Sequence, residues 1–295
     1  MKTHDHDTII RKVFHKIHKD HIISKTGFKR VKNLLNCENL KLPKNYFKNK
    51  ICADFGCGTT GAGGLNLLEL GAKYVHLIDL DRHIVNSINK NLKKYKGKYQ
   101  IDIGSIEKTF YKKNYFDFIL CQGVLHHMDN DMKGLKEIYR TLKKNGKSHL
   151  MVEGSGGLIT KFLMEIIRPE FKNNPIIRNF LKKIMSGDLK NYEKFMFTHY
   201  NNETKKIANF FKGYLDKDLI LTMKDRILAQ KYKTYYEKDL KKLILKIGFR
   251  NIYRIKKKVK FNNIRRLVAP FYYDYSHQAS RALYGEGNIS LVITK

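Results

Sequence analysis

The sequence is poor in cysteine and in acidic residues, and it lacks a long apolar run. Its 295 residues include four cysteines, none of which forms a CxxC pair or a Cys/His block at zinc-ligand spacing. We therefore expect a reduced, intracellular chain without a metal centre. Charged residues interrupt every apolar stretch before it reaches about 18 residues, and the N-terminus has no apolar signal core. These absences predict a cytoplasmic protein with no integral membrane segment.

The shortage of acidic residues leaves the chain strongly basic. There are 59 Lys and Arg against 27 Asp and Glu, a net charge of +32. Such a surface attracts nucleic acid, anionic membrane or acidic substrates. Most of the excess is lysine, however, so a compositional bias of the source genome explains the charge as well as phosphate binding does. The 42% of hydrophobic residues are ample for a buried core and exclude disorder as the main state.

Strand and helix patterns alternate over much of the chain. Apolar strand-like runs are predicted at 51–54, 74–79, 99–103, 116–121 and 147–153, and helical periodicity lies between them at 65–70, 82–95 and 133–143. The alternation resumes with a helix at 236–247 and strands at 249–255 and 289–294. This order is typical of an α/β fold with a mostly parallel sheet and helices on both faces.

Two other stretches read as helical. Apolar residues at helical spacing from Thr8 to about Asn36 predict two N-terminal helices, and residues 154–231 are Lys-rich with few strand signals. We divide the chain into an N-terminal helical lid (1–50), an α/β core (51–153), a helical cap insertion that would cover a substrate site (154–231) and a C-terminal completion of the sheet (232–295).

The clearest motif is a glycine-rich turn after the first strand. Asp54-Phe55-Gly56-Cys57-Gly58-Thr59-Thr60-Gly61 lets the backbone turn sharply before a helix N-terminus. With Asp79 18 positions after Gly61, it satisfies the GxGxxG dinucleotide fingerprint, so a nicotinamide or flavin enzyme is one reading. Asp54 argues against it, because a carboxylate there repels a diphosphate and suits a ligand with an ammonium group.

With that acid in front, the turn resembles motif I of the class I S-adenosylmethionine-dependent methyltransferases, an acidic residue followed by xGxGxG. The third glycine of that pattern falls at Thr60, and here Gly61 follows one place later. The resemblance implies a Rossmann-like sheet of seven strands, S-adenosylmethionine as cofactor, and contacts to it from Asp54, Gly56 and Gly58.

Later blocks resemble the same family in the same order. Asp79, followed by Leu80, matches the acid that accepts hydrogen bonds from both ribose hydroxyls. Gly104-Ser105-Ile106 resembles the block that contacts adenine, with Ser105 where Asp is usual. Residues 116–127 resemble the fourth strand and the LHH turn of many small-molecule methyltransferases. The implied cofactor-binding set is Asp54, Gly56, Gly58, Asp79, Leu80, Ser105, Ile106 and Cys121.

The chemistry that follows is in-line transfer of a methyl group to a small-molecule N, O or S acceptor. An N–H or O–H acceptor must lose a proton, and by family placement His126 is the predicted base, with packing against the cofactor as its alternative role. Asp81 fits an N-cap of the next helix better than a ligand. Three histidines at 15, 18 and 21 are three apart, and we interpret them as a solvated or half-buried face.

The acceptor remains open at this point. Two aromatic clusters, at 195–200 and 271–277, predict either a pocket or ordinary cap packing. A basic run could bind RNA or anionic lipid, or form a solvated strand edge; it comprises Arg254, Lys256, Lys257, Lys258, Lys260, Arg265 and Arg266. RNA methylation is thus the alternative to a small-molecule acceptor. A non-catalytic protein that binds S-adenosylmethionine and a nicotinamide oxidoreductase are further hypotheses.

Overall fold

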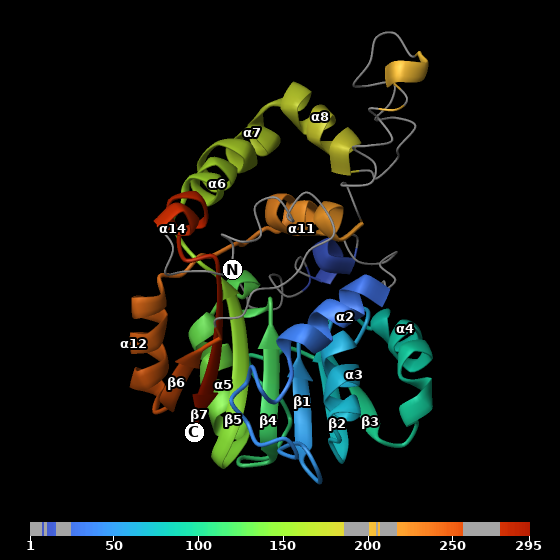
Figure 1. Cartoon of the computed structure of the whole chain (residues 1–295), viewed down its shortest axis with the longest axis vertical. Helices are drawn as coiled ribbons and strands as arrows, with labels where there is room; N and C mark the ends of the chain where they lie inside the picture. Colours follow the sequence, from blue (N-terminus) through green and yellow to red (C-terminus); the bar gives the residue numbers. More distant parts are fainter. Residues whose placement is uncertain are drawn as a thin grey trace.

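A computed structural model describes residues 8, 11–15, 25–185, 201–204, 206, 217–255 and 278–295. They contain a seven-stranded sheet in the order β3-β2-β1-β4-β5-β7-β6 (Figure 1). The strands are β1 (Ile51–Phe55), β2 (Tyr74–Asp79), β3 (Tyr99–Ile103), β4 (Phe116–Gln122), β5 (Leu142–Glu153), β6 (Arg250–Arg254) and β7 (Asn288–Thr294). Strand β7 runs antiparallel to β5 and β6, and the pairs among β1 to β5 are parallel. The predicted mostly parallel sheet of seven strands is confirmed.

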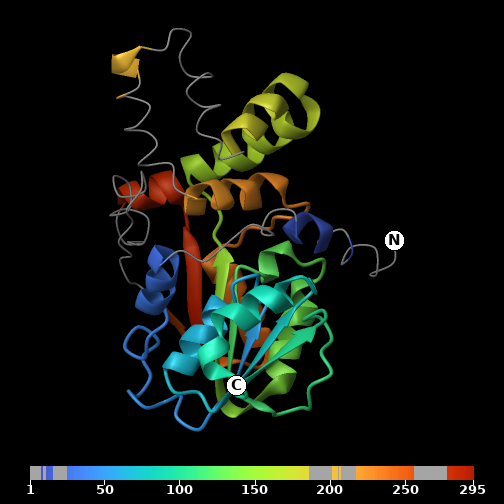
Figure 2. The ribbon, with the colours of Figure 1, turned by 90° about the vertical axis from the view of Figure 1, so that its right-hand side faces the viewer.

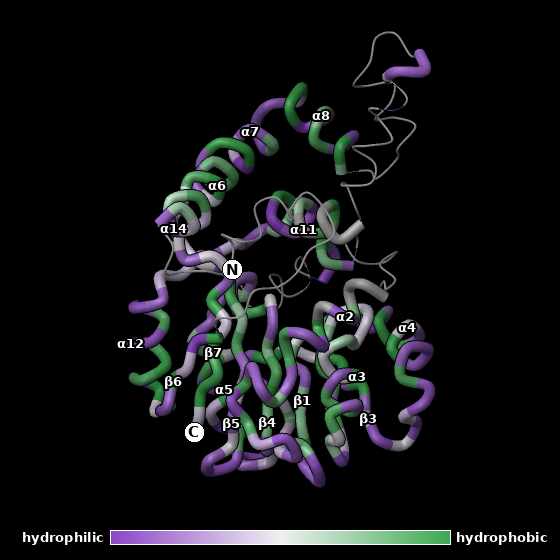
Figure 3. Tube along the Cα trace, in the orientation of Figure 1, coloured by the Kyte–Doolittle hydropathy of each residue, from purple (hydrophilic) through white to green (hydrophobic). Residues whose placement is uncertain are grey.

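Helices cover both faces of the sheet because its central strands are apolar on both sides. In β1, Cys52 packs into one core cluster and its neighbour Ala53 into the other. The Cys52 side is covered by α2 (Lys25–Leu34), α3 (Ala62–Glu69) and α4 (Ile84–Asn91), and the Ala53 side by α5 (Asp131–Thr141) and α12 (Glu237–Ile247). Figure 2 looks along the sheet from its β3 edge, with the helices on either side. Figure 3 shows largely hydrophobic strands and hydrophilic loops at their amino ends.

Local sequence explains where several elements begin and end. The side chain of Asn130 accepts the amide of Lys133 and caps α5. Gly248, at φ 112°, ends α12 in the left-handed conformation that favours glycine. The largest difference from prediction is β5, which begins at Leu142 rather than at residue 147. Leu142 already pairs with Phe116 before a bulge shifts the register.

A group of helices lies beyond the carboxyl ends of the strands (Figure 1). They are α6 (Leu158–Lys161), the π-helical turn η3 (Phe162–Ile167), α7 (Arg168–Asn173), α8 (Pro175–Met185), α11 (Lys217–Leu228) and α14 (Gln278–Tyr284). Leu181 and Met185 of α8 pack with Ile227 of α11 in a core cluster separate from that of the sheet. This cluster joins α8 to α11, and an ion pair between Arg226 of α11 and Glu153 joins α11 to the end of β5.

The chain between α11 and α12 is tied to the ends of β4 and β5. Lys233 donates its amide to the carbonyl oxygen of His126 at 2.8 Å, and Tyr235 forms a parallel bridge with Gly154. None of the helices in the described segments is long and apolar enough to cross a bilayer.

Arg254 departs from the solvated strand edge that the basic run suggested. Its side chain is 5% exposed and forms ion pairs with Glu237 and Glu286, so it joins β6 to α12 and to the turn before β7. The rest of that run, His18, His21 and both predicted aromatic clusters lie outside the described residues.

Candidate active site

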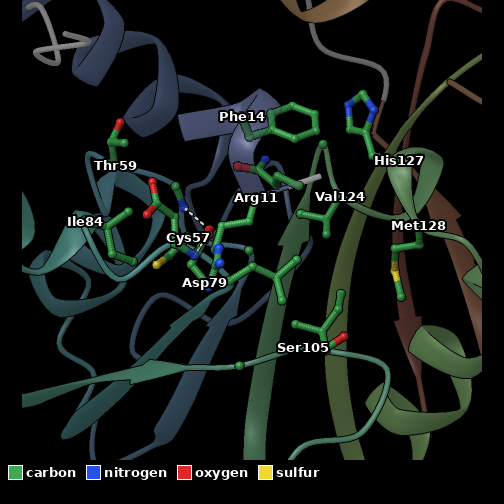
Figure 4. Close-up of a pocket in the computed structure, with 18 of the residues that line it drawn as sticks. Arg11, Phe14, Cys57, Thr59, Asp79, Ile84, Ser105, Val124, His127 and Met128 are labelled. Carbon is green, nitrogen blue, oxygen red and sulfur yellow. Dashed lines mark hydrogen bonds between the residues drawn. The ribbon is translucent and has the colours of Figure 1, made fainter. Parts of the chain in front are cut away.

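A cavity of about 430 Å³ opens at the carboxyl ends of β1, β2 and β4 (Figure 4). The strand order reverses here, because β1 has β2 on one side and β4 on the other. In open α/β sheets this reversal leaves a crevice in which ligands bind. The loops after β1, β2, β3 and β4 line the cavity, together with the helical segment 11–15 and α11. Its volume is within the range typical of small-molecule and cofactor sites.

The floor of the cavity is the glycine turn after β1. Gly56 has φ 75°, and a Cβ on it would lie 2.2 Å from a methyl carbon of Val124, so the turn passes too close to the loop after β4 for any side chain. Gly58, at φ 62°, presents its backbone to the cavity. The Oγ1 atom of the neighbouring Thr59 is buried and has no hydrogen-bond partner among the described residues. A polar ligand group would satisfy it.

Asp79 lies at the end of β2 and lines the cavity as the sequence predicted. Its Oδ2 accepts the amide of Gly58 at 2.9 Å, and its Oδ1 accepts the amide of Asp81 at 3.1 Å. Burial raises its pKa, and the amides of Asp81 and Gly58 oppose that shift. The carboxylate is thus held rigidly, with lone pairs available to a ribose diol.

Asp54 takes a different position from the one predicted. It is 3% exposed, does not line the cavity, and its Oδ2 accepts the amide of Gly64 in the first turn of α3 at 2.8 Å. Burial raises its pKa from 3.8 to about 7, the Gly64 amide opposes this, and the Asp79 carboxylate adds to it. Asp54 therefore positions α3 behind the glycine turn.

The remaining predicted cofactor residues divide into two groups. Leu80, Ser105 and Ile106 line the cavity, where they follow β2 and β3. Cys121 is fully buried inside β4 and points into the core that Ala53 shares, so it does not reach the cavity. The strand's alternation places it on the wrong face.

The structure exchanges the roles expected of the two LHH histidines. His126 is 3% exposed and is absent from the cavity lining, whereas His127 lines it. Burial lowers the pKa of His126 well below its usual range, and the nearby His127 lowers it further. The two rings belong to a 3₁₀ turn, η2 (Leu125–His127), in which successive side chains diverge by about 120°.

The side chains around His127 come from distant parts of the sequence. Its ring meets that of Phe14 edge to face at 4.7 Å between centroids, as Figure 4 shows. Its Nδ1 lies 3.1 Å from the carbonyl oxygen of Lys231, and its Nε2 lies 3.5 Å from Oδ1 of Asp225 on α11.

Among the lining residues that the sequence reasoning missed, Arg11, Phe14, Leu221 and Asp225 come from outside the α/β core. They belong to helical segments that match no motif, and their place on the sheet edge is decided by tertiary packing. The i, i+4 spacing of Leu221 and Asp225 puts both on one face of α11 and is the one signal that the sequence held.

A second contact ties segment 11–15 to the site. The Nδ1 atom of His15 lies 2.8 Å from Oδ2 of Asp81, and its ring stacks obliquely with that of His83. The other Asp81 oxygen accepts the amide of His83 just before α4, so Asp81 serves the start of that helix as predicted, although His83 holds the N-cap position.

The cavity has the opposite charge to the chain as a whole. Among the described residues, its lining contains four acidic residues, Asp79, Asp81, Glu107 and Asp225, and one formal cation, the guanidinium of Arg11. An acidic cavity in a chain of net charge +32 selects cationic ligands and disfavours phosphates.

Comparisons with known proteins agree with this geometry. Residues 53–150 match a family model described as a methyltransferase domain. Over 125 residues the chain is 32% identical to an uncharacterized protein of Methanocaldococcus jannaschii. This matched stretch covers 41% of this chain and 50% of that protein. The chain thus spans about half the length of this curated relative.

Two solved structures share the fold. The 1,6-didemethyltoxoflavin-N1-methyltransferase of Burkholderia thailandensis, solved with its substrate and S-adenosylhomocysteine, has a TM-score of 0.54 at 14% identity, covering 100% of this chain and 91% of that one. The [4+2]-cyclase SpnF has a TM-score of 0.51 at 12% identity, covering 99% and 94%.

Residues 53–150 thus resemble a methyltransferase domain in sequence, and the chain shares the Rossmann-like fold of a methyltransferase. The residues of the cavity fit S-adenosylmethionine. The Asp79 carboxylate, held by the Gly58 amide, has lone pairs for ribose hydroxyls, and Gly56 has no side chain to block a ligand that approaches the backbone closely. The acidic lining suits a sulfonium cation.

We predict that Asp79→Ala lowers the affinity for S-adenosylmethionine about 100-fold or more, because two hydrogen bonds to a carboxylate are lost. Isothermal titration calorimetry measures this loss. The matched control is Asp102→Asn, since Asp102 is a buried carboxylate on β3 that bonds to Tyr111 and does not line the cavity. Wild-type affinity in Asp79→Ala would refute the assignment.

A second prediction concerns Asp54 and pH. Because its pKa is about 7 in the folded chain and 3.8 without burial, the folded state holds this proton more tightly, and ionisation of Asp54 lowers the free energy of unfolding as pH rises from about 4 to about 7. Asp54→Asn keeps an acceptor for Gly64 and removes the titration. Its free energy of unfolding should therefore rise relative to wild type across this window, as measured by urea unfolding.

Asp54→Ala is the contrasting variant for that measurement. It leaves the buried Gly64 amide unpaired and should be less stable than Asp54→Asn by about 1–3 kcal/mol at every pH. Parallel pH profiles of wild type and Asp54→Asn would contradict the raised pKa.

Proposed function

We propose that the chain is an enzyme that transfers the methyl group of S-adenosylmethionine to a small, uncharged or cationic acceptor through nitrogen, oxygen or sulfur. The acidic lining is the observation that carries this proposal. Four acidic residues and one arginine line the cavity in the described part of the chain, and an RNA backbone would have to bring phosphates beside the carboxylates. Residue 254 of the basic run is already engaged with Glu237 and Glu286, so it offers no charge to RNA.

The residues of the cavity divide the work of this reaction. S-adenosylmethionine supplies a methyl group that its sulfonium already activates. Asp79 binds the ribose hydroxyls, Ser105 and Ile106 contact the adenine, and the amide of Gly58 keeps the Asp79 carboxylate in place. Phe14, Val124 and Met128 are apolar lining residues that exclude water from the transfer.

His127 is the group that assists the loss of a proton from an N–H or O–H acceptor. Its Nδ1 faces a carbonyl oxygen, which can only accept a hydrogen bond, so Nδ1 carries the hydrogen and Nε2 is left with a lone pair. Asp225 lies beside that lone pair and stabilises positive charge there. His126, predicted as the base, is buried behind it.

The acceptor class is tested by transfer of a tritiated methyl group from S-adenosylmethionine, run in parallel on total RNA and on a metabolite extract rich in thiols, amines and phenols. We expect label in the extract and none in RNA. Label in RNA would favour the alternative reading, and label in neither, with S-adenosylmethionine bound, would indicate a non-catalytic protein or another reaction of this fold.

We predict that His127→Gln lowers the methyl-transfer rate about 100-fold, the usual size of an acid-base contribution, with little change in cofactor affinity. Rates with the labelled extract and calorimetry with S-adenosylmethionine measure the two quantities. Both variants are compared in chelator-treated protein, where His126→Gln is the matched control and should change the rate much less. A larger rate loss in His126→Gln would restore the role that the sequence assigned to it.

A further inference from the structure

We propose that His126, His127 and Asp225 form a binding site for one divalent transition-metal ion at the acceptor end of the cavity. One ring nitrogen from each histidine and one Asp225 oxygen lie within 4.8 Å of one another. Two imidazoles and a carboxylate are a donor set suited to Zn²⁺, Fe²⁺ or Co²⁺. The catalytic part of this proposal rests on the proposed methyl transfer, whereas ion binding does not.

The hydrogen bonding of His127 is that of a metal ligand. A metal-bound histidine usually donates its other ring N–H to a carbonyl or carboxylate, which fixes the tautomer. Here Nδ1–H donates to the carbonyl oxygen of Lys231 at 3.1 Å. The opposite nitrogen, Nε2, is buried without a hydrogen-bond partner in the described part of the chain, on a residue that is 5% exposed.

Nε2 of His127 and Oδ1 of Asp225 are 3.5 Å apart, and both present lone pairs. Two such atoms face each other stably only with a cation between them. In a tetrahedral site with bonds of about 2.0–2.1 Å, neighbouring ligand atoms are about 3.3 Å apart, so this separation matches one edge. The ring nitrogen of His126 lies no more than 4.8 Å from the other two ligand atoms. It would therefore need to move closer to them by about 1.5 Å at most to reach the tetrahedral spacing.

His126 decides between a proton and a metal ion. A single proton can be shared only between His127 Nε2 and Asp225, and it leaves the buried nitrogen of His126 without a partner. A metal ion can be coordinated by all three groups. The His126 ring lies 4.1 Å from that of His127 between centroids, and its Nδ1 is buried without a partner among the described residues. Tyr232 packs against both rings at 5.3 Å and holds them in place.

The site has the open character of a catalytic metal centre. Three protein ligands leave a position free, and His127 and Asp225 both line the cavity, so that position faces the bound acceptor. With a metal ion bound, Nε2 of His127 would be a ligand and not the base. The ion would assist proton loss in its place, by binding an acceptor oxygen and lowering the pKa of its hydroxyl, whose proton would leave to solvent.

A second cluster, His15, Asp81 and His83, has similar donors but is satisfied without an ion. One Asp81 oxygen is 2.8 Å from His15 Nδ1 and the other accepts the amide of His83. This cluster supplies the matched control, His83→Gln, because it removes an exposed histidine that does not line the cavity.

The test is Co²⁺ binding to the full chain, freed of any polyhistidine tag and stripped with a chelator. Equilibrium dialysis gives the stoichiometry and visible absorption reports the coordination. We expect one tightly bound Co²⁺ per wild-type chain. Asp225→Asn and His127→Gln should bind it at least about tenfold more weakly. His83→Gln should equal wild type, and Asp225→Glu should retain binding because the carboxylate remains.

Absence of stoichiometric Co²⁺ in the wild type, equal affinity in all variants, or a loss confined to His83→Gln would overturn the proposal. Circular dichroism confirms that each variant is folded. Calorimetry with S-adenosylmethionine on the chelated samples tests the cofactor site separately. Failure there would refute the proposed function and leave the metal result standing.

Discussion

The Asp79 carboxylate accepts the amide of Gly58, and this bond fixes the turn after β1 against the end of β2. The rest of the cavity follows from it. With the turn held there, Gly56 lies so close to Val124 that a side chain is excluded, and the loops after β1 and β4 close the floor together. The buried Asp54 supports the arrangement from behind by accepting the amide of Gly64 in α3. Two carboxylates at neighbouring strand ends thus organise the backbone before any ligand binds.

Much of the fold could be predicted because its signals are local. Strands β2 and β3 have the predicted bounds, since apolar runs between turn residues specify a buried strand without reference to the rest of the chain. The glycine turn, Asp79 and Ser105 were predicted for a related reason. They follow consecutive parallel strands, and the carboxyl ends of such strands meet at one edge.

What could not be predicted depended on orientation or on distant contacts. Cys121 and Asp54 belong to the right strands but point away from the cavity, and an apolar run buried on both sides does not reveal which face a residue occupies. His126 and His127 are adjacent in a 3₁₀ turn, where a change of one residue rotates a side chain by about 120°. Arg11 and Asp225 reach the site only through packing of helices that carry no motif.

The charge of the chain also has a different meaning once the cavity is known. The net charge of the chain was equally consistent with anionic partners and with a compositional bias of the genome. The described lining of the cavity instead contains four acidic residues and one arginine, so the charge inside the cavity is opposite in sign to the net charge of the chain. A sulfonium cofactor gains from the local carboxylates at contact distance, where interactions are least screened by salt. The basic surface is not needed to explain recognition at the site.

The position of Asp225 links that recognition to the cap. Asp225 belongs to α11, which packs against α8 and is joined to the end of β5 by the ion pair of Arg226 with Glu153, whereas His127 belongs to the turn η2 that follows β4. Any ligand that contacts both residues binds only when α11 is docked. By linkage, binding of such a ligand stabilises the docked position of α11. The free energy of this stabilisation equals the gain in ligand-binding free energy that docking of α11 provides. The His127 end of the cavity is therefore completed by tertiary packing of the cap, while the Asp79 end is formed mainly by the loops after β1, β2 and β3.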